Sequence, residues 1–87
     1  MQNDFIHIGN SYYLAAQHIR SIVNPNTASV KRILKIMREN HAVTDATRGQ
    51  KTRSVIFTAG SHAYRSSLAV EDISGLLLIS KEKKWEE

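Results

Sequence analysis

A chain of 87 residues with a hydrophobic fraction of 41% has the size of one folded domain, which buries only about 60–65% of its unfolded surface. The sequence contains no cysteine, which excludes disulfide bonds and thiolate metal sites and leaves self-association as a source of further burial. The net charge of +4 is unevenly distributed, because nine basic but only two acidic residues lie from Arg20 to Arg65, and this concentration favours a polyanionic partner.

The apolar pattern predicts an α+β fold, in which two helices cover a small and mostly antiparallel sheet. Residues 12–16 suit either a strand or a turn, whereas the other segments are better defined. In chain order, strands are expected at residues 5–8, 12–16 and 19–23, a helix at 28–40, strands at 42–46, 53–58 and 62–67, and a helix at 69–79. Tight turns join the last three strands, which favours antiparallel pairing among them.

The first helix has the clearest periodicity of the sequence. The arc expected to pack against the sheet is apolar and comprises Val30, Ile33, Leu34, Ile36 and Met37. The opposite arc is a solvated or anion-binding surface and carries Lys31, Arg32, Lys35 and Arg38. Two asparagines flank Pro25, and either Asn24 or Asn26 is expected to cap the start of this helix. Gly75 lies in the second helix, where a glycine lowers helix stability by about 1 kcal/mol relative to alanine. We therefore expect that packing requires a glycine at this position.

Residues 1–80 are predicted to form a single domain, followed by a charged and flexible tail at residues 81–87. The N-terminal segment lacks the basic start and the long apolar run of a signal peptide. The apolar run at residues 76–79 is far shorter than the ~20 residues that span a bilayer. The chain is therefore expected in the cytoplasm, without a membrane partner.

Catalysis is one function to test, because histidines and carboxylates are both present. The histidines have neither the spacing of a metal-binding pair nor a carboxylate in helical register. Asp45 stands beside a basic turn, where hydrogen bonds or an ion pair with Arg53 would order the chain. We therefore expect no enzyme, no cofactor, no metal ion and no small-molecule substrate. A deep pocket that joins His18 or His62 to Asp45 would argue otherwise.

The most informative stretch is a glycine-centred turn at residues 47–52 with strand-like residues on both sides, which is interpreted as a basic hairpin. Arg48, Lys51, Thr52 and Arg53 supply three cations and a hydroxyl within six residues, and such groups contact phosphate oxygens. Single-strand recognition usually needs aromatic side chains between the cations, and few aromatics are present. The stretch predicts contact with the backbone of double-stranded DNA, and the alternative is an ordinary solvated surface.

The spacing Asp45-Ala46-Thr47-Arg48-Gly49-Gln50-Lys51-Thr52-Arg53-Ser54-Val55-Ile56 is fairly specific, and it is accompanied by Phe5–Gly9, Ile22–Pro25, Ala28, Lys31-Arg32, His62 and Ser66-Ser67. Together these residues resemble the RemA-type extracellular matrix regulatory proteins over residues 5–78. The resemblance implies a cytoplasmic homo-oligomeric ring that binds DNA and activates genes for biofilm matrix production and osmoprotection. A ring agrees with the small core, and it would raise the affinity of a weak basic turn through avidity.

The resemblance also implies which residues bind DNA, and this chain departs from the family at several of them. The two positions after the turn glycine are typically arginine in the family, and here they are Gln50 and Lys51. A third DNA-contacting arginine falls at His18, and Arg20 would replace it by facing the same side of an extended strand. The predicted site comprises Lys51 and Arg53 as leading phosphate contacts, then Arg48, Thr52, Arg20, Gln50 and His18. The alternative function is an oligomeric scaffold or protein-interaction paralogue with weakened or lost DNA binding.

Overall fold

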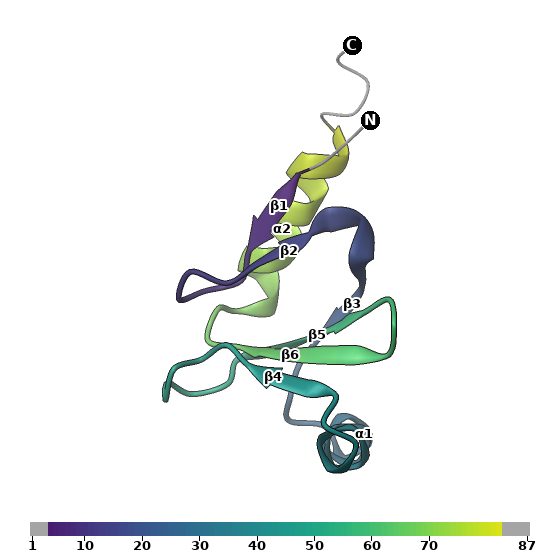
Figure 1. Ribbon diagram of the computed structural model, residues 1–87. Helices are drawn as coiled ribbons and strands as arrows, with labels where there is room; N and C mark the ends of the chain where they lie inside the picture. The colour runs from purple at the N-terminus through teal and green to yellow at the C-terminus, as the bar shows by residue number, and fades with distance from the viewer. Residues whose placement is uncertain (1–3, 83–87) are drawn as a thin grey trace.

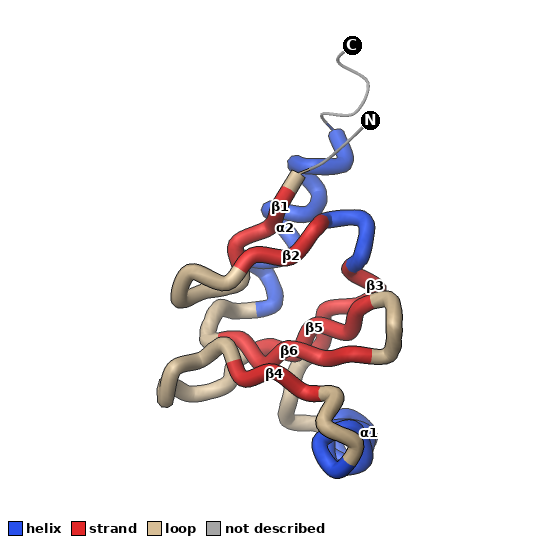
Figure 2. The backbone as a smooth tube through the Cα atoms, viewed as in Figure 1, coloured by secondary structure: helices blue, strands red, loops and turns tan. Residues whose placement is uncertain are grey.

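The computed structural model describes residues 4–82 and confirms the α+β class (Figure 1). Strands and helices follow the expected order, with one addition, a turn of 3-10 helix before the third strand (Figure 2). The elements are β1 (Phe5–His7), β2 (Tyr13–Ala15), the 3-10 helix η1 (Ala16–His18), β3 (Ile19–Val23), α1 (Ala28–Glu39), β4 (Val43–Asp45), β5 (Ser54–Thr58), β6 (His62–Ser66) and α2 (Val70–Glu82). Residues 83–87 of the predicted tail lie outside the described part of the chain.

The elements form three layers, with a four-stranded sheet in the middle (Figure 1). The strand order of this sheet is β3-β5-β6-β4. α1 covers one face, while the β1–β2 hairpin and α2 lie against the other. The side chains of β5 alternate between the layers, so that Val55 packs toward α1 and Ile56 toward the hairpin and α2. A strand buried on both faces explains the continuous apolar run in the sequence.

Each face of the sheet carries its own small core. The core under α1 is built on the buried side chains Leu34, Val55 and Ala63. The core on the other face comprises Ile6, Ile8, Leu14, Ala46, Ile56 and Ile73. Because the apolar burial is divided between two thin layers, neither core is large, and the domain gains stability from any partner that covers further apolar surface.

The predicted hairpin through residues 44–58 is wrong. β4 and β5 are not hydrogen-bonded neighbours, because β6 lies between them. β4 pairs with β6 in parallel, with Asp45 opposite Arg65, whereas β5 pairs antiparallel with both β3 and β6. The prediction failed because short connections favour the pairing of consecutive strands, and here the connection crosses the end of an intervening strand.

The cap of α1 also differs from the prediction. The Thr27 hydroxyl accepts a hydrogen bond from the Val30 amide at 3.2 Å, which satisfies one free N–H of the first turn. The side chain of Asn24 instead accepts a hydrogen bond from the Asn26 amide at 2.7 Å, which closes the turn that precedes the helix. The threonine caps the helix because it stands directly before the first helical residue.

The apolar arc of α1 is wider than the surface that the sheet covers. Leu34 is buried, and Val30 and Met37 pack beside it. Ile33 and Ile36 were expected to pack in the same way, yet they remain 44% and 53% exposed. The helix therefore contacts the sheet along one edge of its apolar arc and presents the other edge to its surroundings.

Candidate nucleic-acid interface

Residues 46–53 connect β4 to β5 and are called the basic loop below. Its first half is a tight turn in which the Gln50 amide donates a hydrogen bond to the Thr47 carbonyl at 3.1 Å. Arg48 and Gly49 have φ angles of 52° and 86°, the left-handed values that a type I′ turn requires at its central positions. Glycine adopts such values without strain, so Gly49 permits the turn that presents Arg48 at its exposed end.

Asp45 fixes the start of the basic loop. Its Oδ1 accepts hydrogen bonds from the Thr47 hydroxyl at 2.6 Å and from the Thr47 amide at 2.9 Å. These two hydrogen bonds, aided by the Arg65 guanidinium, hold the pKa of Asp45 below its usual value of 3.8 although partial burial opposes them. The carboxylate is therefore charged near neutral pH and orders the turn, as the sequence predicted.

Arg65 of β6 ties the two ends of the basic loop together. Its Nη1 lies 3.4 Å from Oδ2 of Asp45, and its Nε donates a hydrogen bond to Oγ1 of Thr52 at 3.1 Å. The ion pair suggested between Asp45 and Arg53 is thus made by Arg65 instead. No local pattern in the sequence indicates this role of Arg65, because only the parallel register of β4 and β6 places it opposite Asp45.

Two further hydrogen bonds hold the backbone at the ends of the basic loop. The Asn10 side chain, in the turn between β1 and β2, donates from Nδ2 to the Ala46 carbonyl at 2.9 Å. At the other end, the Arg53 amide donates to the Ser66 carbonyl at 2.8 Å. The loop is therefore anchored to two separate segments of the chain, the β1–β2 turn and β6, which restricts its conformations before any ligand binds.

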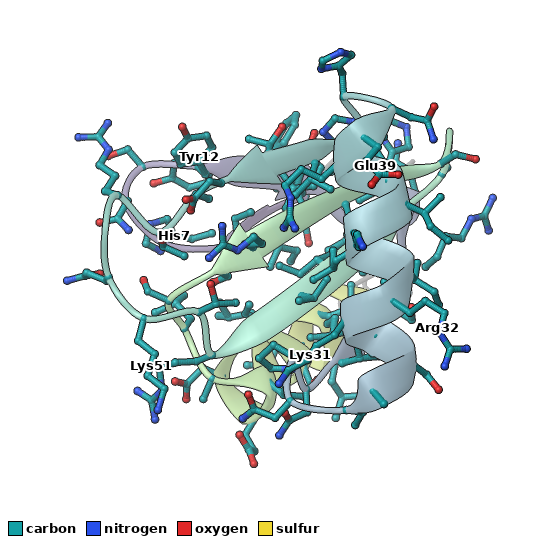
Figure 3. All side chains as sticks on the ribbon, turned by 90° about the horizontal axis from the view of Figure 1, so that it is seen from below. His7, Tyr12, Lys31, Arg32, Glu39 and Lys51 are labelled. Carbon is teal, nitrogen blue, oxygen red and sulfur yellow. The ribbon has the colours of Figure 1, made fainter. Side chains whose placement is uncertain are left out.

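Four side chains of the basic loop are exposed, and they are Arg48, Gln50, Lys51 and Arg53. Figure 3 shows Lys51 projecting from the edge of the molecule, well away from the labelled residues of α1. Thr52 is half-buried and its hydroxyl accepts the hydrogen bond from Arg65, so its own proton is available to an external acceptor. The loop thus offers cations and polar donors on one exposed surface.

A polar recess of about 240 Å³ lies beside the basic loop. Lys51 and Arg53 line it together with Asn24 and Asn26 of the β3–α1 connection, and Glu71 of α2 also contributes. A phosphate at its mouth would meet cations and amide donors, while the Glu71 carboxylate would disfavour deeper entry. From the sequence, the two asparagines are expected only as helix caps.

The structure separates His18 and Arg20 from the basic loop. The loop enters β5 at Ser54, whereas β3 begins beside Thr58 at the other end of that strand. Four residues of extended strand separate these two ends by about 13 Å. Figure 2 shows the connection between β4 and β5 on the opposite side of the sheet from the start of β3. The expectation that Arg20 shares one side of an extended strand with His18 is wrong, because His18 ends a 3-10 helix and the register of β3 is irregular at Arg20. Within one copy, the predicted site residues form two sets.

Asp45 and His62 have separate side-chain partners and do not contact each other. Asp45 bonds to Thr47 and Arg65, and His62 shares a hydrogen bond of 2.8 Å with Thr44. In this part of the chain no three metal-ligating side chains gather. Nor does any helix described there have the length and apolar character needed to cross a membrane.

Asp45→Asn should reduce stability more at neutral pH than at low pH. The folded pKa lies below the unfolded value, so the carboxylate stabilises the fold above pH 3.8 and loses this effect as the pH falls through the folded pKa. Urea denaturation should give a difference in unfolding free energy from wild type that is largest near about pH 7 and shrinks toward about pH 3. Asparagine keeps the acceptor oxygen, so an equal difference at both pH values would contradict a role for the charge.

Comparison with known proteins agrees with the resemblance found in the sequence. A family model described as Extracellular matrix regulatory protein A-like matches residues 5–77, which run from β1 through the basic loop into α2. A putative regulatory protein of Geobacillus thermodenitrificans is 39% identical over 77 residues, 88% of each chain. One from Oceanobacillus iheyensis is 37% identical over 83 residues, 95% of each chain, and one from Trichormus variabilis is 35% identical over 82 residues, 94% of this chain and 93% of the other. Since the match spans nearly the whole described fold, the chain belongs to the RemA-like family.

Proposed function

We propose that this protein is a homo-oligomeric transcriptional regulator that binds duplex DNA through phosphate contacts from the basic loop. The observation that carries this proposal is an exposed set of cations on a loop anchored by Asp45, Arg65 and Asn10. Side chains on an anchored loop lose less conformational entropy on binding than side chains on a mobile loop. The family and the names of the curated relatives support a regulatory role, and the family description suggests genes of the extracellular matrix. The resemblance of the sequence adds genes for biofilm formation to this proposal.

Within the basic loop the residues have different roles. Lys51 and Arg53 are the leading phosphate contacts, because both are exposed cations beside the polar recess. Arg48 adds a cation from the turn, and Thr52 adds a hydroxyl donor. Gln50 offers its amide to a phosphate or to a base edge. Because lysine is a point charge without the planar fork of arginine, Lys51 suits backbone contact better than base recognition.

A ring of copies would present the basic loop repeatedly to one DNA molecule. One loop provides few phosphate contacts and would bind weakly alone, but copies joined in one particle bind at a high effective concentration. His18 and Arg20 are exposed near the end of β5 that lies about 13 Å along the strand from the loop, and in this proposal they add a second set of contacts along the same duplex. Oligomerisation is thus part of the binding mechanism.

Titration of a long DNA duplex at several salt concentrations tests the proposal. The logarithm of the association constant should fall linearly with the logarithm of the salt concentration, by about 0.9 per phosphate contact. A single strand of equal length should bind more weakly, because few aromatic side chains are available for base stacking.

No binding at low salt by an intact oligomer would favour the second candidate, an oligomeric scaffold. That candidate is motivated by the uncharged side chain of Gln50 and by His18, at positions where the family resemblance expects arginines.

Gln50→Arg should strengthen DNA binding by about tenfold or more. The side chain is exposed between Arg48 and Lys51, so the new cation would reach the same phosphates and steepen the salt dependence by about one unit per engaged copy. The same titration measures both effects. Ala28→Arg is the matched control, since it adds the same charge at an exposed position on α1. An equal gain from the control would show that net charge rather than the loop determines affinity.

A further inference from the structure

The walls of the polar recess come from three segments that lie far apart in the sequence. Asn24 and Asn26 belong to the β3–α1 connection, Lys51 and Arg53 to the basic loop, and Glu71 to the first turn of α2. All five side chains are exposed, and the recess measures about 240 Å³. Because pockets for drug-sized ligands usually measure about 300–1,000 Å³, this recess suits a smaller molecule.

Hydrogen bonds hold these three segments together at the end of the sheet. The Ser54 hydroxyl, at the start of β5, donates to the Leu68 carbonyl at 2.8 Å and so fixes the segment that precedes α2. β3 ends beside the start of β5, because Val23 lies opposite Val55, and Asn24 follows directly. A ligand would therefore meet walls that are already positioned, which lowers the entropy lost on binding.

The charges of the recess divide it into two parts. Lys51 and Arg53 attract an anion, and the structure shows no ion pair between either cation and Glu71. The Glu71 carboxylate repels a second anion, and an ionised carboxylate can only accept hydrogen bonds. A ligand that fills the recess thus needs an anionic group for the cations and a hydrogen-bond donor for Glu71.

A hydroxyl group is the donor that suits this environment. An ammonium group beside Glu71 would also lie near Lys51 and Arg53, which repel it, whereas a hydroxyl carries no charge. The Asn24 Oδ1 accepts the hydrogen bond from the Asn26 amide, so the Nδ2 group of Asn24 remains available to further hydroxyl oxygens. The sugars inside a DNA strand carry no free hydroxyl, so these groups exceed what a DNA phosphate needs.

We propose that the polar recess binds a small phosphate monoester that carries hydroxyl groups. Its phosphate contacts Lys51 and Arg53, and one hydroxyl donates to the Glu71 carboxylate. Polyol phosphates, sugar phosphates and ribonucleotides share this chemistry. Since the proposed function assigns the same two cations to DNA, the ligand competes with the duplex and makes DNA binding responsive to a small molecule. This competition rests on the proposed function, whereas the binding of the ligand does not.

Glycerol 3-phosphate and propyl phosphate are matched probes, because both are three-carbon phosphate monoesters and only the first carries free hydroxyls. In titration calorimetry, wild type should bind glycerol 3-phosphate about tenfold more tightly, since hydrogen bonds to a charged acceptor are strong. Equal affinities, or no binding of either probe, would overturn the proposal. Ribose 5-phosphate and AMP, titrated in the same way, distinguish a sugar or a nucleotide from a polyol.

Glu71→Ala should abolish the preference for the hydroxyl groups. Glycerol 3-phosphate should bind about tenfold more weakly, and propyl phosphate at least as tightly as before, because the repelling carboxylate is gone. Asp72→Ala is the matched control, since this exposed residue follows Glu71 on α2 and lies outside the lining of the recess. Circular dichroism checks that both variants fold. A preference that survives in Glu71→Ala would place the ligand elsewhere and overturn the site.

Displacement of a fluorescent duplex separates this inference from the proposed function. At equal ionic strength, glycerol 3-phosphate should release the duplex at a lower concentration than propyl phosphate. If the two probes release it equally, only screening acts and the competition is overturned. If calorimetry shows the preference and its loss in Glu71→Ala, but wild type binds no duplex DNA, the recess stands as a binding site and the proposed function fails.

Discussion

Lys51→Glu is expected to lower the affinity of the oligomer for a long DNA duplex by about 100-fold or more at moderate salt. The substitution removes one cation from every copy and adds an anion near the phosphates that the loop contacts. Because several copies engage one DNA molecule in the proposed assembly, the loss is multiplied over the engaged loops. The salt dependence should become shallower by about one unit per engaged copy. A fluorescence anisotropy titration at three or more salt concentrations measures both quantities.

Lys31→Glu is the matched control for this prediction. It changes the net charge by the same amount at an exposed position on α1, which Figure 3 shows away from Lys51. We expect only a small, non-specific loss of affinity, with the salt dependence close to wild type. Native mass spectrometry of both variants should confirm an unchanged oligomer. Equal losses from the two variants would remove Lys51 from the contact surface and leave only a general effect of net charge.

Ser66→Ala is expected to lower the free energy of unfolding by about 2–4 kcal/mol. Ser66 is fully buried at the end of β6, where its Oγ donates to the Ile8 carbonyl at 2.6 Å and accepts from the Leu68 amide at 3.0 Å. Alanine would leave two backbone groups without their partners inside the protein. Small domains have a total stability of only about 5–15 kcal/mol, so the effect would be a large fraction of it. Urea denaturation at a fixed protein concentration gives the value.

Ser21→Ala serves as the control for the buried hydroxyl. Ser21 is exposed on β3, so its replacement should change the stability by no more than about 0.5 kcal/mol. A loss below about 1 kcal/mol in Ser66→Ala would contradict the role given to the hydroxyl, since the backbone groups would then have other partners. Ser66 is one of the residues that carry the resemblance to the family. Its hydroxyl holds the chain just after β1 against the end of β6.

Local patterns predicted most of the elements, because each depends on residues close together in the chain. The helical period of α1 and the apolar run of β5 both placed their elements correctly. The glycine at position 49 likewise indicated a tight turn, and the observed φ angles bear this out. Such features follow from backbone sterics and from the alternation of side chains, which act over a few residues.

Features that depend on contacts between distant residues could not be predicted from the sequence. The parallel pairing of β4 with β6 has no local signal, and the position of Arg65 next to Asp45 follows only from that pairing. The separation of Arg20 from the basic loop likewise depends on which end of β5 lies beside the start of β3. Periodicity placed Ile33 and Ile36 on the apolar side of α1, but it could not show how much of that side the sheet covers.

The parallel pair also has a consequence for the order of folding. The basic loop is complete only when Arg65, at the far side of the following hairpin, has reached Asp45 and Thr52. Closing such non-local contacts requires the intervening chain to be ordered first, and contacts of this kind form late. A nascent chain that ends before β6 would carry every cation of the loop without its geometry. In the proposed function, the binding of a polyanion would then depend on the finished fold.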